Sequence, residues 1–445
     1  MQPNALLDAL LAEAGMSHAG LAAHVNQAGR TRGLALRYEH TAVTRWLKGQ
    51  RPRGQVPDLI CEVIGGRLRR PLSLDDVGFG VPGQPADPHG SPLSGFVDRA
   101  AALWRSDGNG RQPLDAGALT GTPAVMPVWE WENPPEDADV SREGPIRVGP
   151  EHVEILKAAR AHYELMYRRA GGVATRDRVV RFLGTETAPM LRGSYSDGLG
   201  RGLHRAGGSL VAVAGICAYD SDAHGLAQRY FHQALRLAKA SGDRGLGAYV
   251  IALIVNQCLH LREFRQAVAF AEAALRAAGR HTTPALAADL YAMQAKAYAQ
   301  LGDTAAALAC IRRAEAAAER IRPGTEPDET GYVQPGLVNV QVAEALLGMG
   351  DLRAAHQQAA AAVGTPAHDR GRVHRLAMLC EIQLRQGEAD QAVASAAEMA
   401  ERAKGMESLR LRDRLRAVRE QLLTSGCSGA EETAELIDGA LRVPL

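Results

Sequence analysis

The residues best suited to chemistry in this chain form a short run at positions 41–49, Thr-Ala-Val-Thr-Arg-Trp-Leu-Lys-Gly. At helical spacing, Val43 and Trp46 fall on one side of the run, while its threonines and cations fall on the other. Hydroxyls and cations on an exposed face, held by an aromatic anchor beneath, suit a helix that lies in the major groove of DNA. The run therefore predicts a recognition helix.

The polar residues in and around this run have different expected roles. Arginine can hold the O6 and N7 atoms of guanine in a fork that lysine cannot copy, so we expect base contacts from Arg45 and Thr44 first. Phosphate contacts set the register of a protein on DNA without reading the sequence, and we expect them from the cations that follow. The candidate DNA-binding residues are His40, Thr41, Thr44, Arg45, Lys48, Arg51, Arg53, Arg30, Arg32 and Arg37.

Charge is unevenly distributed along the chain. The 445 residues carry a formal net charge of only +1, but residues 18–71 hold ten Lys and Arg against three acids. The rest of the chain is therefore net acidic. A basic module on an acidic body is typical of a protein that meets phosphate through one part only, and a merely solvated basic surface is the alternative.

Short helices must position the recognition helix. Asn4 and Ser17 are suitable N-caps for two helices, the first ending at Gly15, and another helix is expected at residues 56–68. Residues 17–49 resemble the helix-turn-helix of phage-repressor-like regulators, with residues 17–25 as the positioning helix and 41–48 as the recognition helix. The sequence departs from that family in the connection, where residues 26–40 replace a tight turn. We expect the arginines of this insertion to touch phosphate or a groove.

Residues 81–150 hold eleven of the 22 prolines and nine glycines, a composition that resists regular structure. Residues 96–104 are nevertheless patterned as a short amphipathic helix, and Trp129 and Trp131 lie close together. We expect a linker whose aromatic residues dock on a neighbouring domain, a plain flexible tether being the alternative.

Residues 151–445 show an internal repeat of small residues that would let paired helices approach closely and stack into a superhelix. A generic alanine-rich bundle is the alternative. The pattern resembles the tetratricopeptide repeat, although its period is longer. The repeated alanines are Ala227, Ala267, Ala307, Ala355 and Ala392. Twelve residues before them lie Gly215, Val255, Ala295, Ala343 and Cys380, and seven after them Ala234, Ala274, Ala314, Ala362 and Met399.

In tetratricopeptide proteins the first helix of each pair lines a concave groove. Carried onto this repeat, the resemblance implies a polar groove that suits a peptide or a small polar signal. For any single one of these residues, an ordinary solvated helix face is the favoured alternative. The implied groove residues are Asp220, Asn256, His260, Asp289, Lys296, Gln300, Glu344, Glu381 and Arg385.

A broader resemblance covers nearly the whole chain. It rests on the order of the parts and on residues 129–134, 163–165, 188–193 and 219–231. These look like the Streptomyces regulators that combine a helix-turn-helix with tetratricopeptide repeats, which include the NsdA-type repressors of sporulation and antibiotic production. The resemblance implies transcriptional regulation of development or secondary metabolism.

Other function classes find little support. The six cysteines are dispersed with no C-x-x-C, no histidine pair has the spacing of a metal site, and Gly-x-Ser-x-Gly is absent. We therefore expect no catalytic residue, no metal and no cofactor. Residues 1–15 lack a basic signal-peptide start, and the apolar stretches are too short to span a membrane, which predicts a cytoplasmic protein.

The expected architecture is all-α: a helix-turn-helix domain at 1–80, a Pro/Gly-rich linker at 81–150 and a TPR-like α-solenoid at 151–445 that serves as sensor and oligomerisation platform. The expected partners are double-stranded DNA, a peptide or small-molecule effector in the groove, and a second copy of the chain, since palindromic operators favour homodimers. The alternative function is a scaffold that binds a partner protein or signalling peptide, with a degenerate helix-turn-helix that does not bind DNA.

Overall fold

The computed structural model describes residues 3–31, 34–68, 72, 74, 76–79, 93–108, 116–322 and 324–442. Across these ranges the regular structure is helical, and extended backbone pairs only at two isolated bridges, which confirms the expected all-α class. None of the helices in the described ranges has the length and apolar character needed to cross a membrane.

The chain divides into two compact units. The first comprises residues 1–114, 143–147 and 180–194, and the second comprises residues 115–142, 148–179 and 195–445. This division differs from the expected boundaries at 80 and 150, because part of the Pro/Gly-rich zone packs into each unit. One limit of the first unit falls within helix α8 (Gly172–Phe182).

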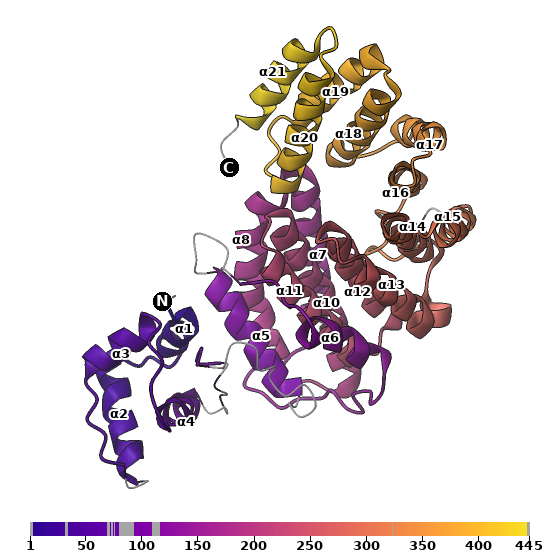
Figure 1. The fold of residues 1–445 in the computed structure, drawn as a ribbon. Helices are drawn as coiled ribbons and strands as arrows, with labels where there is room; N and C mark the ends of the chain where they lie inside the picture. The colour runs from indigo at the N-terminus through magenta and orange to yellow at the C-terminus, as the bar shows by residue number, and fades with distance from the viewer. Residues whose placement is uncertain are drawn as a thin grey trace. The chain divides into compact units, whose positions relative to one another are not determined.

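The first unit is built on four short helices that share one core (Figure 1). They are α1 (Ala5–Glu13), α2 (His18–Thr31), α3 (His40–Leu47) and α4 (Val56–Leu68). The expected caps are present: Asn4 Oδ1 accepts from Leu7 N at 3.1 Å, and Ser17 Oγ accepts from Gly20 N at 3.1 Å. Apolar residues at helical spacing, including Leu21, Val43 and Ile60, are completely buried between the helices.

Three further helical elements lie within the first unit. Helix α5 (Leu93–Gly108) contains the amphipathic stretch expected at 96–104 and buries Trp104 completely. It packs against α1, against the π-helical turn η1 (Leu183–Thr187) and against α9 (Ala188–Leu191). Arg105 on α5 pairs with Glu13 next to the end of α1, at 2.7 Å.

The second unit is a succession of antiparallel helix pairs (Figure 1). The first helix of each pair also contacts the first helix of the next pair, so the pairs stack in a curved row with these first helices on the inner side. The paired helices are α10 (Asp197–Asp220) with α11 (His224–Ser241), α12 (Arg244–His260) with α13 (Phe264–Ala278), α14 (Pro284–Leu301) with α15 (Thr304–Ala318), α16 (Pro335–Gly348) with α17 (Leu352–Gly364), and α18 (Asp369–Gln386) with α19 (Ala389–Ala403).

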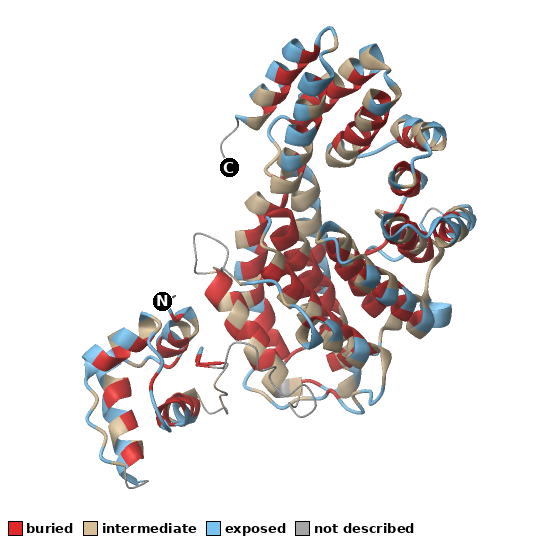
Figure 2. Cartoon of the chain, in the orientation of Figure 1, coloured by how far each residue is buried: buried red, intermediate tan, exposed pale blue. Residues whose placement is uncertain are grey.

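The row has additional helices at both ends. Helix α7 (Pro150–Ala170) packs on α10, and α20 (Leu409–Ser425) and α21 (Ala430–Leu441) pack on α18 and α19. The 3₁₀ turn η2 (Gly279–His281) links α13 to α14. Buried residues follow the sides of the helices that face their neighbours, and exposed residues follow the outer sides (Figure 2).

The repeated small residues are the contact points of the helix pairs. All fifteen positions that define the repeat are buried. At Gly215 a Cβ atom would lie only 2.5 Å from the ring of Phe231 on α11, so the absence of a side chain on α10 makes room for that ring. The spacing read from the sequence is therefore the packing register of the helices.

The Pro/Gly-rich zone docks through one of its two neighbouring tryptophans. Helix α6 (Thr122–Glu132) lies on α11 and α13 within the second unit. Trp131 is buried against Gly247 of α12. A Cβ atom added at Gly247 would lie 2.0 Å from the indole nitrogen of Trp131, so only glycine fits at this position. Arg244 donates to the carbonyl of Trp131 at 2.7 Å, whereas Trp129 is 48% exposed. The zone is thus a helical part of the second unit at this point.

Candidate functional site

Helix α3 has one buried and one exposed face. Ala42, Val43 and Trp46 lie in the core shared with α1, α2 and α4, and Trp46 is 4% exposed, as expected for an anchor. The C-terminal end of α3 is fixed by a hydrogen bond from Asn4 N to Leu47 O at 2.7 Å. Gly49 follows at φ +95°, a conformation that favours glycine and ends the helix.

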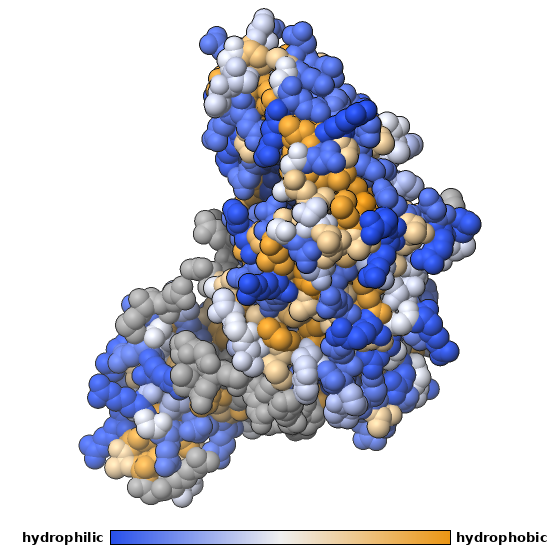
Figure 3. Space-filling view, turned by 45° about the vertical axis from the view of Figure 1, so that its right-hand side comes forward, coloured by the Kyte–Doolittle hydropathy of each residue, from blue (hydrophilic) through white to orange (hydrophobic). Residues whose placement is uncertain are grey.

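Most of the candidate DNA-binding residues are exposed. Hydrophilic residues predominate on the visible face of this group of helices (Figure 3). Thr44 is half-buried, and its hydroxyl donates to His40 O at 3.1 Å, which leaves its oxygen lone pairs as acceptors. Arg32 lies outside the described residues. The exposed members of the set are His40, Thr41, Arg45, Lys48, Arg51, Arg53, Arg30 and Arg37.

The connection before α3 is shorter than the sequence indicated. Helix α2 continues to Thr31, so residues 26–31 are helical and the extra connection begins only after them. The side chain of Asn26 clamps the returning segment, since it donates to Tyr38 O and accepts from Tyr38 N, both at 2.8 Å. The Tyr38 ring meets Trp46 edge to face, with centroids 5.1 Å apart. The segment that carries Arg37 is thereby tied to both α2 and α3.

Two of the expected groove residues are buried hydrogen-bonding residues in the second unit. Asp220 is completely buried and accepts from Gly172 N at 2.7 Å. Asp289 is 2% exposed and accepts from Tyr332 Oη at 2.6 Å and from Gln341 Nε2 at 2.9 Å. Because the protein itself occupies these carboxylates, they hold helices and loops together rather than offer oxygens to a ligand.

Lys296 and Glu344 form the centre of a charged cluster on neighbouring first helices. Lys296 Nζ on α14 lies 2.8 Å from Glu344 on α16. Burial opposes the ionisation of Glu344, but Lys296 and then Arg414 outweigh it and lower its pKa to about 2. Burial, followed by the charge of Arg414, lowers the pKa of His374 on α18 to about 3. The cluster therefore brings side chains from α14, α16, α18 and α20 together.

The remaining groove candidates are less enclosed. His260 and Gln300 are exposed at the ends of α12 and α14, and Asn256 is half-buried. Glu381 pairs with Arg385 one turn away on α18, at 2.8 Å. These residues stay candidates for contact with a ligand.

A segment of the chain itself covers part of the first helices. In the loop between α15 and α16, Glu329 is 5% exposed and bonds to Arg205 of α10 at 3.0 Å and to Ser209 of α10 at 2.8 Å. Tyr332 in the same loop reaches Asp289 of α14, and its ring lies 6.4 Å from that of Tyr249 on α12. The loop therefore contacts three consecutive first helices, α10, α12 and α14, in or next to the N-terminal half of each.

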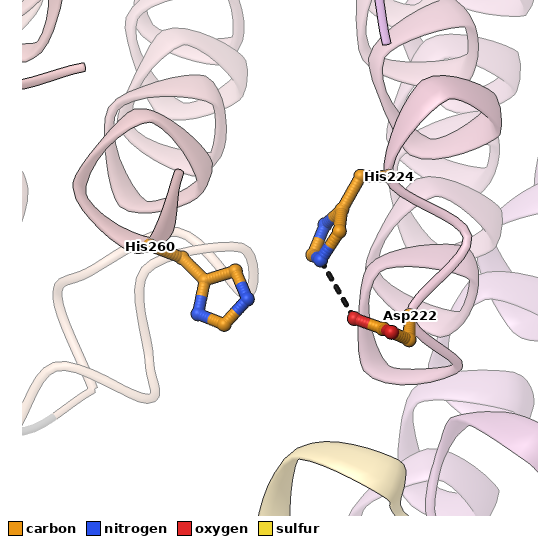
Figure 4. A group of neighbouring side chains, drawn as sticks. All are labelled: Asp222, His224 and His260. Atoms are coloured by element: carbon orange, nitrogen blue, oxygen red, sulfur yellow. Dashed lines mark ion pairs between the residues drawn. The ribbon is translucent and has the colours of Figure 1, made fainter. Parts of the chain in front are cut away.

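Sequence reasoning missed one cluster of chemically capable side chains. Asp222, His224 and His260 each offer one ligand atom, and these atoms all lie within 4.8 Å of one another (Figure 4). His260 had been singled out only as a groove residue. Searching the sequence for two metal ligands one helical turn apart does not find this cluster, because its residues come from the α10–α11 turn and from the end of α12. The signal in the sequence was the repeat, which places the end of one first helix beside the turn of the preceding pair.

Comparison with known proteins concerns the N-terminal part of the chain. A family model described as the SP15 N-terminal domain matches residues 7–80, a stretch that takes in most of α1 and all of α2, α3 and α4. No curated protein matches the chain. The N-terminal helical group is therefore similar to that domain family.

Proposed function

We propose that this protein is a DNA-binding transcriptional regulator in which α2 and α3 form a helix-turn-helix. The observation that carries the proposal is the two-sided character of α3. Its apolar side is anchored by Trp46, and its other side presents Arg45 and Lys48 to solvent, followed by Arg51 and Arg53. An arginine on a fixed, exposed helix face can read guanine in the major groove, and the flanking cations can hold phosphate.

The second unit is, in this proposal, a TPR-like solenoid that receives a signal or a second copy of the chain. The regular burial of the repeat positions and the stacked first helices support a solenoid. The charged cluster around Lys296 and Glu344, together with the exposed ends of α12 and α14, supports a polar ligand or peptide. A development or secondary-metabolism regulon follows from the family resemblance alone.

The test is an electrophoretic mobility shift with the full-length protein on its own upstream DNA, with excess nonspecific DNA as competitor. Arg45→Ala should weaken specific binding by roughly 1–3 kcal/mol, or about 5- to 150-fold, since a bidentate contact to guanine is lost. The matched control is Arg312→Ala, which removes an exposed arginine from α15 in the second unit.

A shift that Arg45→Ala leaves unchanged, or that Arg312→Ala weakens equally, would contradict the role of α3. Absence of any specific shift across upstream fragments would favour the scaffold function instead. Light scattering of the same preparation would test the proposed homodimer.

A further inference from the structure

The cluster of Asp222, His224 and His260 is formed by two consecutive helix pairs (Figure 4). His224 Nε2 lies 2.8 Å from Asp222 Oδ1 across the α10–α11 turn. The rings of His224 and His260 have centroids 4.8 Å apart, and His260 comes from the end of α12. One carboxylate and two imidazoles thus converge on one point at the edge of the row of helices.

The backbone at this turn is unusual for its residue type. Asp222 has φ +60° and Arg262, at the equivalent position of the next pair, has φ +63°, whereas glycine fills this left-handed position in the following pairs, as at Gly302 (φ +79°) and Gly350 (φ +84°). A residue with a side chain is strained there, although aspartate tolerates this region better than most. The turn therefore keeps a carboxylate where glycine would be the easier choice.

His224 also has an unmet bonding requirement. Its Nδ1 is buried and has no hydrogen-bond partner within the described part of the chain. A hydrogen bond between His224 and Asp222 accounts for only one side of the ring and leaves His260 outside the interaction. A cation placed between the three side chains would engage Nε2 of His224, the nitrogen that faces Asp222, together with that carboxylate and His260, and so would use all three side chains.

We propose that Asp222, His224 and His260 bind a divalent transition-metal ion of the Zn²⁺ class. Two imidazoles and one carboxylate are a donor set that zinc accepts, with bonds of about 2.0–2.2 Å. Four-coordinate geometry places such ligand atoms about 3.3 Å apart. The present ligand atoms lie within 4.8 Å of one another, so small rotations of the exposed Asp222 and His260 side chains would bring them to that spacing. Hard cations such as Mg²⁺ prefer oxygen ligands and should be rejected.

The bound ion would join the α10–α11 turn to α12 by coordination and keep at least one position open. That position faces the surface, where water or a further donor completes the shell. The proposal concerns metal binding and stands independently of DNA binding.

The experiment uses full-length protein that has been stripped with a chelator and dialysed. Zn²⁺ is titrated in competition with a chromogenic zinc chelator, and Co²⁺ serves as a spectroscopic probe. We expect one equivalent of Zn²⁺ per chain, no competition by Mg²⁺, and cobalt d–d bands without a thiolate charge-transfer band, because the proposed ligands contain no cysteine.

The informative variant is Asp222→Gly. It removes the carboxylate but puts the residue best suited to φ +60° into the turn, so the fold is preserved. Loss of a residue that only supports a metal ligand weakens metal binding by at least roughly 10-fold. Asp222→Gly and His260→Gln remove ligands themselves, so each should weaken Zn²⁺ binding by more than that. The matched control, His281→Gln, removes an exposed histidine outside the cluster and should bind as the original protein does.

Unchanged affinity in Asp222→Gly and His260→Gln, a thiolate band with Co²⁺, or no saturable Zn²⁺ binding by the original protein would each overturn the proposal. Circular dichroism of every variant verifies that lost binding is not lost folding.

Discussion

The carboxylate of Asp220 and the hydroxyl of Ser408 form a 2.8 Å hydrogen bond across 188 residues of sequence. Asp220 ends α10, and Ser408 caps α20. The same carboxylate pairs with Arg370 of α18, whose guanidinium lies 4.7 Å from the ring centre of Tyr167. The last helices of the second unit are thus tied back to its first helix pair.

Backbone hydrogen bonds reinforce this closure. Glu407 N donates to Ala170 O at 2.8 Å, and Val173 N donates to Glu407 O at 3.4 Å. Gly171 between them leaves no room for a side chain, because a Cβ atom would lie 2.3 Å from the carbonyl oxygen of Glu407. A row of helix pairs that would otherwise end freely is held in one curvature.

Asp220→Ala should destabilise the second unit by about 3 kcal/mol, because it leaves the Arg370 guanidinium partly buried without its carboxylate. Ser408→Ala removes the hydrogen bond to this carboxylate, worth about 1.5–3 kcal/mol, and also the cap of α20, worth about 1 kcal/mol. Urea unfolding followed by circular dichroism measures both. Asp328→Ala, which removes an exposed aspartate, is the control and should change little. Equal stability of Asp220→Ala and this control would contradict the closure.

Stability should depend on pH through His204. This imidazole is completely buried, and burial lowers its pKa to about 4. The unfolded chain takes up the proton near pH 6.5 and the folded chain only near pH 4, so folding stability falls as pH drops between these values, by up to about 1.4 kcal/mol per pH unit.

His204→Leu removes the contribution of His204 to the pH dependence of stability and leaves the contributions of the other histidines in place. Between pH 7 and pH 5 the original protein should lose about 2 kcal/mol more stability than the variant. Unfolding free energies from urea titrations at the two pH values give the comparison. His281→Leu, which removes an exposed histidine, is the control and should lose as much stability between the two pH values as the original protein does. If His204→Leu also loses as much stability as the original protein, His204 does not have different pKa values in the folded and unfolded chain.

The clamp made by Asn26 should matter for DNA binding under the proposed function. Asn26→Ala removes two hydrogen bonds that hold the Tyr38 backbone, worth about 1 kcal/mol each, and so releases the segment with Arg37. We expect several-fold weaker binding in a mobility shift, whereas Gln27→Ala, at the exposed neighbouring position, should bind normally. If both variants bind equally well, the segment before α3 has no part in the interface.

The salt dependence of binding separates phosphate contacts from base contacts. Each neutralised phosphate contributes about −0.9 to the slope of log K against log salt concentration. Lys48→Gln and Arg53→Gln should therefore each make that slope less steep by about one while lowering affinity on all sequences alike. Fluorescence anisotropy with a labelled duplex at several salt concentrations gives the slopes. If the slopes stay unchanged, Lys48 and Arg53 do not contact the phosphates of DNA.

Much of the local structure was predictable from the sequence. The caps at Asn4 and Ser17, the anchor at Trp46 and the all-α class were confirmed, because capping and helical periodicity act within a few residues. The expected end of the second helix at residue 25 was wrong, since α2 continues to Thr31. Polar residues do not stop a helix when neighbouring contacts, here the clamp from Asn26, support it.

The sequence by itself determined which residues pair the helices, because a small residue at a crossing leaves room for the neighbouring helix, as Gly215 does for the ring of Phe231. Only the tertiary structure decided what the polar residues do. It buried Asp220 and Asp289 and brought His260 beside Asp222 and His224. These contacts depend on how successive helix pairs curve, and that curvature adds up many small rotations that no local pattern in the sequence records.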